Sequence, residues 1–119
     1  MSVVLLTGLV MAACGGGDDP PELSPAGEEG RQIAADNSCG ACHGNNGQGA
    51  SGPAWIGLLG SERELTDGTV LTADRDYIVR SILNPSSEVV GGFVIRMPEN
   101  TLTDDEARLV ATYIEELAG

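Results

Sequence analysis

The sequence predicts an all-α domain of three to five short helices, and three observations support this fold class. Two segments, 74–84 and 103–117, carry apolar side chains at helical spacing. No stretch alternates apolar and polar residues in the way that a half-buried strand would. The chain contains 17 Gly and only 3% aromatic residues, so a folded unit of roughly 90 residues has little of its own to build a core around. Small domains of this composition usually need a disulfide, a metal or a cofactor for stability. We expect the helices of this domain to surround a cofactor.

The N-terminus begins with an apolar run at residues 3–13. This run is far shorter than the ~20 residues of a membrane-spanning helix, and its length suits the core of a signal peptide. The junction before Cys14 resembles the lipobox of bacterial lipoproteins, in which the Cys becomes the lipidated first residue of the mature chain. Residues 1–10 contain no Lys or Arg, so we expect the true translation start to lie upstream. The alternative is an apolar N-terminus with an incidental Cys.

The next segment, residues 15–26, is rich in Gly, Pro and acidic residues and has no periodicity, which is typical of a flexible linker. Extended at about 3.1 Å per residue, it would reach ~35–40 Å, enough to hold a domain clear of a membrane. We therefore divide the chain into a lipoprotein-type signal peptide at 1–13, a lipidated Cys14 with a linker at 14–26, and a folded domain at 27–119.

The first helix of the folded part is expected to begin near Ser24, because Pro25 suits the first helical position, and to end at Asn37. Residues 44–72 are Gly-rich and are predicted to be mostly loop, with a short helical turn around 54–59.

Two further helices have clear ends. The segment 74–84 reads as a helix that Pro85 stops, and Tyr77, Ile78, Ser81 and Ile82 share one of its faces. In the last helix Thr103 and Glu106 form a capping box. Its apolar stripe then consists of Val110, Tyr113, Ile114 and Leu117.

The chemistry is predicted by Cys39-Gly40-Ala41-Cys42-His43, which fits the Cys-x-x-Cys-His signature of haem c attachment. Two thiols three residues apart on a tight turn can reach the two vinyl groups on adjacent edges of a porphyrin, and the following His is then held under the iron. A thioredoxin-like dithiol would also use Cys-x-x-Cys, but in a βαβ setting that this chain does not suggest. A zinc site would need four ligands, whereas the chain has one His and only Cys14 as a further Cys.

His43 is thus the expected fifth iron ligand, and Met97 is the candidate for the sixth. Met97 is the only Met left once the leader is removed, and Pro98 restricts it to extended geometry. A lone Met is more often core filler, but after this motif we expect it to bind the iron, and a second His is not available. His/Met ligation raises the reduction potential. It also leaves no open iron position, so we expect a carrier and not an enzyme.

Over residues 27–118 the chain resembles class I c-type cytochromes, and most closely the cytochrome c domain of subunit II of caa-type haem-copper oxidases. The order and spacing of the matching residues make the resemblance specific. The matching positions are Gly30, 39–44, 47–49, 52–61, 65–68, 72–74, Tyr77, 81–85, 92–93, Met97-Pro98 and Tyr113-Ile114.

The resemblance implies a class I cytochrome c fold around one covalent haem c. It implies that Gly30 and Tyr113 meet where the first and last helices cross, and that the Pro53 carbonyl accepts a hydrogen bond from His43. It also implies haem-wall roles for Trp55, Leu58 and Ile82. Many members place a Trp where Ala73 stands, bound to a haem propionate; here Arg75, Arg80 or Arg96 could neutralise a propionate instead.

Charge narrows the choice of partners. With 18 acidic residues against 6 Arg the net charge is -12, which argues against nucleic acid and favours a basic partner. The oxidase subunit also has copper ligands that this chain lacks. We therefore expect an exported single-electron carrier without a small-molecule substrate. It would be anchored by lipid at the outer face of the cytoplasmic membrane or in the periplasm, and would pass electrons from a quinol-oxidising complex to a terminal oxidase. The alternatives are a permanently bound haem subunit of a larger respiratory complex and a haem-based sensor with labile Met97.

Overall fold

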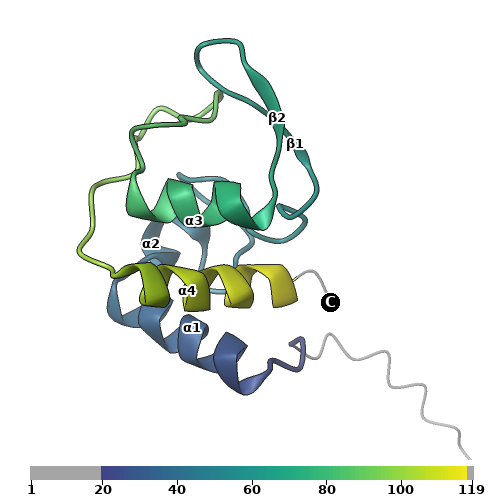
Figure 1. The fold of residues 1–119 in the computed structure, drawn as a ribbon, viewed down its shortest axis with the longest axis vertical. Helices are drawn as coiled ribbons and strands as arrows, with labels where there is room; N and C mark the ends of the chain where they lie inside the picture. Colours follow the sequence, from purple (N-terminus) through teal and green to yellow (C-terminus); the bar gives the residue numbers. More distant parts are fainter. Residues whose placement is uncertain (1–19, 118–119) are drawn as a thin grey trace, which may run out of the picture.

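The computed structural model describes residues 20–117, in which four helices and one two-stranded sheet are found (Figure 1). The predicted signal peptide and Cys14 lie outside these residues. The helical fold class is confirmed, and none of the described helices is long and apolar enough to cross a membrane. In chain order the elements are α1 (Pro25–Asp36), α2 (Gly40–His43), β1 (Glu62–Glu64), β2 (Val70–Thr72), α3 (Arg75–Leu83) and α4 (Asp104–Glu116).

Helix α1 begins and ends where the sequence predicts. The Ser24 hydroxyl accepts a hydrogen bond from the N–H of Gly27 at 3.1 Å, Pro25 occupies the first turn, and Asn37 is the C-cap. The last two residues of the predicted linker, 25–26, are therefore helical.

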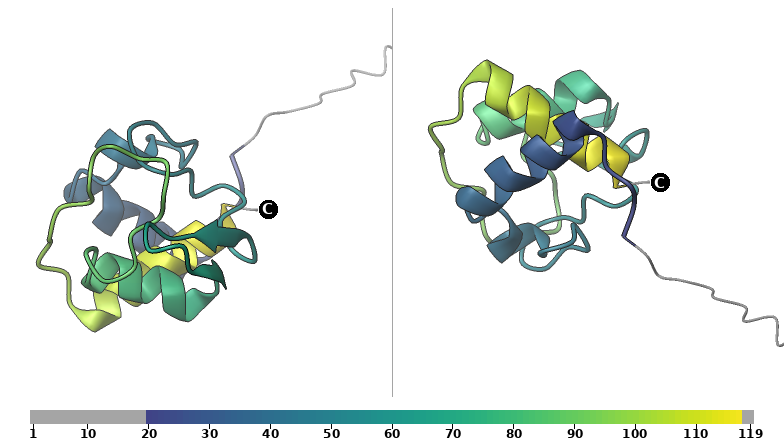
Figure 2. Two further views of the ribbon diagram at one scale, coloured as in Figure 1. Left: turned by 90° about the horizontal axis from the view of Figure 1, so that it is seen from above. Right: turned by 90° about the horizontal axis from the view of Figure 1, so that it is seen from below.

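Helices α1 and α4 pack against each other at an angle (Figure 1, Figure 2). A Cβ added to Gly30 would lie 2.0 Å from the carbonyl oxygen of Leu109 and 3.1 Å from the Cβ of Tyr113. Only glycine allows the two backbones to approach so closely. The crossing of Gly30 with Tyr113, which the resemblance implies, is thus confirmed.

The ends of α3 and α4 also follow local sequence signals. The carboxylate of Asp74 caps α3 by accepting from the N–H of Tyr77 at 2.7 Å, and α3 ends before Pro85. In α4 the predicted capping box is present: Thr103 accepts from the N–H of Glu106 at 3.3 Å, and Glu106 accepts from the N–H of Thr103 at 2.8 Å. The apolar faces of these helices form most of the core. Its buried residues there are Tyr77, Ile78, Val79, Ile82, Ala107, Val110, Ala111, Tyr113 and Ile114.

The loop predicted at 44–72 contains an antiparallel hairpin that the sequence does not reveal. Strand β1 pairs with β2 in the register Glu62–Thr72, Arg63–Leu71 and Glu64–Val70. The hairpin projects at the end of the molecule away from α1 (Figure 1). The helical turn predicted around 54–59 is wrong: the N–H of Leu58 donates to the Trp55 carbonyl at 3.0 Å in a single turn, without a helix.

Candidate haem site

The Cys-x-x-Cys-His motif lies on α2, a single helical turn. The N–H groups of Cys42 and His43 both donate to the carbonyl of Cys39, at 3.3 and 3.1 Å. Helical geometry places residues three and four apart on one face, so both thiols and the imidazole face the same side. The left-handed backbone of Gly44, at φ +83°, then ends the turn. Burial raises the pKa of the Cys39 thiol, which therefore keeps its proton at neutral pH.

The ring of His43 is oriented by two neighbours. Its Nδ1 lies 2.8 Å from the carbonyl oxygen of Pro53. Because a carbonyl can only accept, Nδ1 carries the proton, and the lone pair of Nε2 is left for a metal. The ring also stacks on Trp55, with centroids 4.8 Å apart and planes 20° apart. The predicted role of Pro53 is confirmed in its geometry.

The protonation of His43 follows from the same surroundings. Burial lowers the pKa of the imidazole, and the hydrogen bond to Pro53 opposes this with a smaller effect. The neutral ring, which is the form that binds a metal, is therefore favoured to lower pH than in a free histidine.

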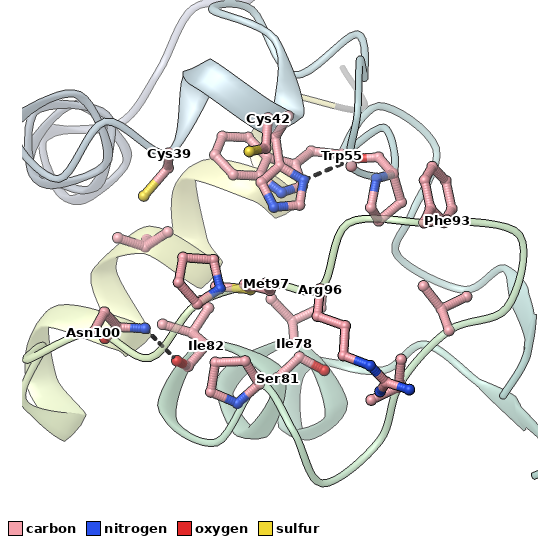
Figure 3. Close-up of a pocket in the computed structure, with 18 of the residues that line it drawn as sticks. Cys39, Cys42, Trp55, Ile78, Ser81, Ile82, Phe93, Arg96, Met97 and Asn100 are labelled. Carbon is pink, nitrogen blue, oxygen red and sulfur yellow. Dashed lines mark hydrogen bonds between the residues drawn. The ribbon is translucent and has the colours of Figure 1, made fainter. Parts of the chain in front are cut away.

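A cavity of about 260 Å³ opens beside the motif. Its lining is predominantly apolar, and Met97 lies across it from Cys42 and Trp55 (Figure 3). The residues that the sequence analysis assigned to haem attachment, iron binding and the haem walls all line this cavity: Cys39, Cys42, His43, Pro53, Trp55, Leu58, Ile82 and Met97.

Met97 lies in a long loop that is held at its ends. Gly91 donates to the carbonyl of Glu64 at 2.9 Å, and within the described structure the backbone of residues 92–99 forms no further backbone–backbone hydrogen bond. Beyond Met97, the side-chain amide of Asn100 donates to the Ile82 carbonyl at 2.7 Å (Figure 3) and accepts from the N–H of Leu102 at 3.1 Å. Asn100 thereby ties the Met97 loop to α3, a role that the sequence analysis missed.

The arginines divide into those inside and outside the cavity. Arg75 pairs with Glu115, and Arg80 pairs with Glu88 at 3.0 Å; neither arginine lines the cavity. Arg96, the third predicted propionate partner, does line it. The cavity also contains Arg63, which the sequence analysis missed because it lies on the unpredicted strand β1.

Two buried donors in the cavity lack partners. The Nε of Arg63 and the hydroxyl of Ser81 are buried and form no hydrogen bond with any described residue. Buried polar groups in folded proteins are nearly always satisfied, so an orphaned pair in one cavity indicates a missing acceptor. A haem fits these residues: its apolar ring matches the walls, its two vinyl groups match the two thiols, and its propionates match the orphaned donors.

The alternative sites find no support in the described structure. Among residues 20–117 no group of three or more His, Cys, Asp and Glu side chains is arranged to hold a metal ion. The motif lies between α1 and an irregular loop, and not in a βαβ unit. Within residues 20–117 the structure thus gives no support to the zinc or dithiol interpretation, and Cys14 lies outside these residues.

Comparison with known proteins agrees with the geometry. A family model described as Cytochrome c matches residues 27–118, a range that includes the motif, the cavity walls and Met97. A comparison with curated proteins gives no match. The match covers most of the chain, and the matched residues build a cavity suited to a haem fixed at two thiols. The chain belongs to the cytochrome c family, whose members transfer electrons through the iron of a covalently bound haem c.

Proposed function

We propose that this protein is a monohaem electron carrier in which His43 and Met97 bind the haem iron from opposite sides. The observation that carries the proposal is the arrangement of the cavity. Met97 lies across it from Cys42, which immediately precedes the histidine whose Nε2 is free (Figure 3). No other His exists in the chain, and among residues 20–117 Met97 is the only Met that lines the cavity.

The haem iron, when bound, accepts and releases one electron. The chain's part is to hold the ligands and exclude water. His43 is oriented by Pro53 and Trp55. The thioether of Met97, bound to the iron, would raise the reduction potential. Because His43 and Met97 would leave no open position on the iron, we propose that the protein has no enzymatic activity and no small-molecule substrate.

Carbon monoxide tests this closed iron site, because it binds ferrous haem only where an axial position is open. We expect the reduced wild-type protein not to bind carbon monoxide within the mixing time, and the Met97→Ala variant to bind it at once. A Met97→His variant, which restores a ligand, is the matched control and should again resist binding. Rapid binding by the wild type would contradict the proposal and favour the haem-based sensor.

The partners are proposed from charge and resemblance. A net charge of -12 favours a basic docking surface, and carriers of this kind use small, transient interfaces. We propose a quinol-oxidising complex as donor and a terminal oxidase as acceptor, which the resemblance to the oxidase-linked domain supports. Size-exclusion of detergent-solubilised membranes distinguishes the rival, since a stoichiometric complex that survives high salt would make the protein a fixed subunit.

We also propose that the protein is exported and anchored by lipid at Cys14. The lipobox-like junction supports this, and the acidic linker after it would give the domain reach. Mass spectrometry of the mature protein should find an acylated Cys14 at its N-terminus. A Cys14→Ser variant should leave the haem spectrum intact and release the protein from membranes. An unmodified N-terminus upstream of Cys14 would contradict the anchor.

A further inference from the structure

The pairing of the arginines separates two of them from the rest. The chain has six arginines and no lysine, against 18 acidic residues. In a chain so rich in carboxylates, an arginine without one needs an explanation. Within residues 20–117, Arg63 and Arg96 form no ion pair, and both line the cavity. The four that do form ion pairs there are Arg31 with Glu28, Arg75 with Glu115, Arg80 with Glu88 and Arg108 with Asp104.

Arg63 is directed to the cavity by the strand that carries it. On β1 its two neighbours Glu62 and Glu64 are exposed, whereas Arg63 is half-buried and lines the cavity. Alternate residues of a strand face opposite sides, so the acidic neighbours point away from the site. The Nε of Arg63 is buried without an acceptor.

Ser81 adds a second donor from another element. It lies on α3, and its hydroxyl is also buried without a partner in the described structure. In the close-up Ser81 and Arg96 lie on the same side of the cavity, away from Cys39 and Cys42 (Figure 3). An unsatisfied buried donor costs free energy, and an anion in the cavity would remove that cost.

We propose that Arg63 and Ser81 bind a carboxylate of the haem, as the propionate-binding end of the cavity, and that Arg96 supplies the second positive charge there. The inference rests on the proposed attachment of haem at Cys39 and Cys42. It balances charge, since two guanidinium groups meet two propionates. It also gives the two orphaned donors acceptors.

Other charged groups around the cavity do not compete for Arg63. Glu88 lines the cavity but pairs with Arg80 at 3.0 Å, and Glu99 lines it but accepts from the Ser86 hydroxyl at 3.2 Å. Two titratable rings also line the cavity: His43, which is bound to Pro53, and Tyr77 on α3. The two carboxylates add negative potential, so a propionate without Arg63 would ionise less readily.

The test is the pH dependence of the reduction potential of the holo-protein. A propionate beside an arginine has a low pKa, which appears as a pH-dependent step in the potential. In Arg63→Gln we expect this pKa to rise by about one unit or more and the potential at neutral pH to fall, because a positive charge near the iron is lost. Arg108→Gln makes the same charge change in an exposed pair outside the cavity, and should leave the step in place.

Two further variants keep the test decisive if Arg63→Gln folds poorly. Ser81→Ala removes a donor without changing the charge, and should raise the propionate pKa by less than Arg63→Gln. Arg63→Lys keeps the charge but loses the guanidinium fork, and should lie between wild type and Arg63→Gln.

The possible failures are distinguishable. Haem retained with the same pH profile in Arg63→Gln, Ser81→Ala and Arg108→Gln would overturn the assignment of Arg63 and Ser81 alone. A wild-type protein without haem on a stained denaturing gel would overturn the proposed function itself.

Discussion

A ligand histidine needs one tautomer and one ring orientation before it can bind iron in a fixed geometry. At His43 both come from the loop that follows it. The N–H groups of Gly49 and Gly52 donate to the carbonyls of His43 and Cys42, at 2.7 and 2.9 Å, so the loop is bound back onto α2. This brings the Pro53 carbonyl within reach of Nδ1. A Cβ on Gly52 would lie 3.3 Å from the imidazole, so a side chain there would crowd the ring.

Met97, the proposed ligand on the opposite side, has a different kind of support. Met97 is 36% exposed and lies in a loop without regular hydrogen bonding, so its position depends on a few side-chain contacts. Asn100 supports this loop by satisfying two backbone groups at once, the carbonyl of Ile82 and the N–H of Leu102. Asn100 is thus a positioning residue for Met97.

The Asn100→Ala variant tests that role. It leaves the Ile82 carbonyl and the Leu102 N–H without partners, at a cost of about 1–3 kcal/mol. We expect Met97 to leave the iron at a lower urea concentration than the helices unfold. The measurement follows the methionine-to-iron absorption band and the helical circular dichroism in the same titration.

The matched control for Asn100→Ala is Ser86→Ala. This variant removes only the exposed hydrogen bond from Ser86 to Glu99, on the same loop. It should change neither midpoint measurably. Coincident midpoints for the two probes in Asn100→Ala, as in the wild type, would show that Asn100 supports the whole domain and not the ligand loop.

At the scale of elements, the helices were predictable because residues adjacent in the sequence determine where each helix begins and ends. Ser24, Asp74 and Thr103 each accept from a backbone N–H three residues on, so each start depends on a few adjacent residues. The close approach of α1 and α4 at Gly30 could be predicted only from the family resemblance, because a glycine within a helix does not indicate which other helix packs against it.

The hairpin could not be predicted from local sequence signals of this kind. Each strand has only three residues, and their exposed, half-buried, exposed pattern involves no apolar alternation in β1. Its geometry comes from a turn at Gly68, where the side chain of Asp67 accepts from the N–H of Thr69 at 2.9 Å. When this element was missed, Arg63 was missed with it.

The residues of the candidate site divide in the same way into those that could be predicted from the sequence and those that could not. Cys39, Cys42, His43 and Met97 could be named from the sequence, because few residues of those types exist in the chain. Asn100 could not be named from the sequence, because its side chain donates to the carbonyl of Ile82, which lies 18 residues away. Arg63 and Ser81 could not, because only the folded structure reveals which polar atoms are buried without partners.

At the scale of the whole molecule, the core and the cofactor site form one unit. The buried residues on α3 and α4 include Ile78, Ile82, Val110 and Ile114, and these same side chains line the cavity. With few aromatic residues to fill the interior, the helices surround a space that a haem would complete. A bound haem would therefore stabilise the fold as well as supply the redox chemistry.

The proton NMR spectrum of the reduced holo-protein tests the central claim most directly, namely that Met97 completes the iron coordination opposite His43. A methionine bound to ferrous haem lies in the ring current of the porphyrin, so its methyl resonance moves far upfield of all other signals. We predict one such set of resonances in the wild type and its loss in Met97→Leu. A wild-type spectrum without shifted methionine resonances would contradict the closed site and the electron carrier built on it.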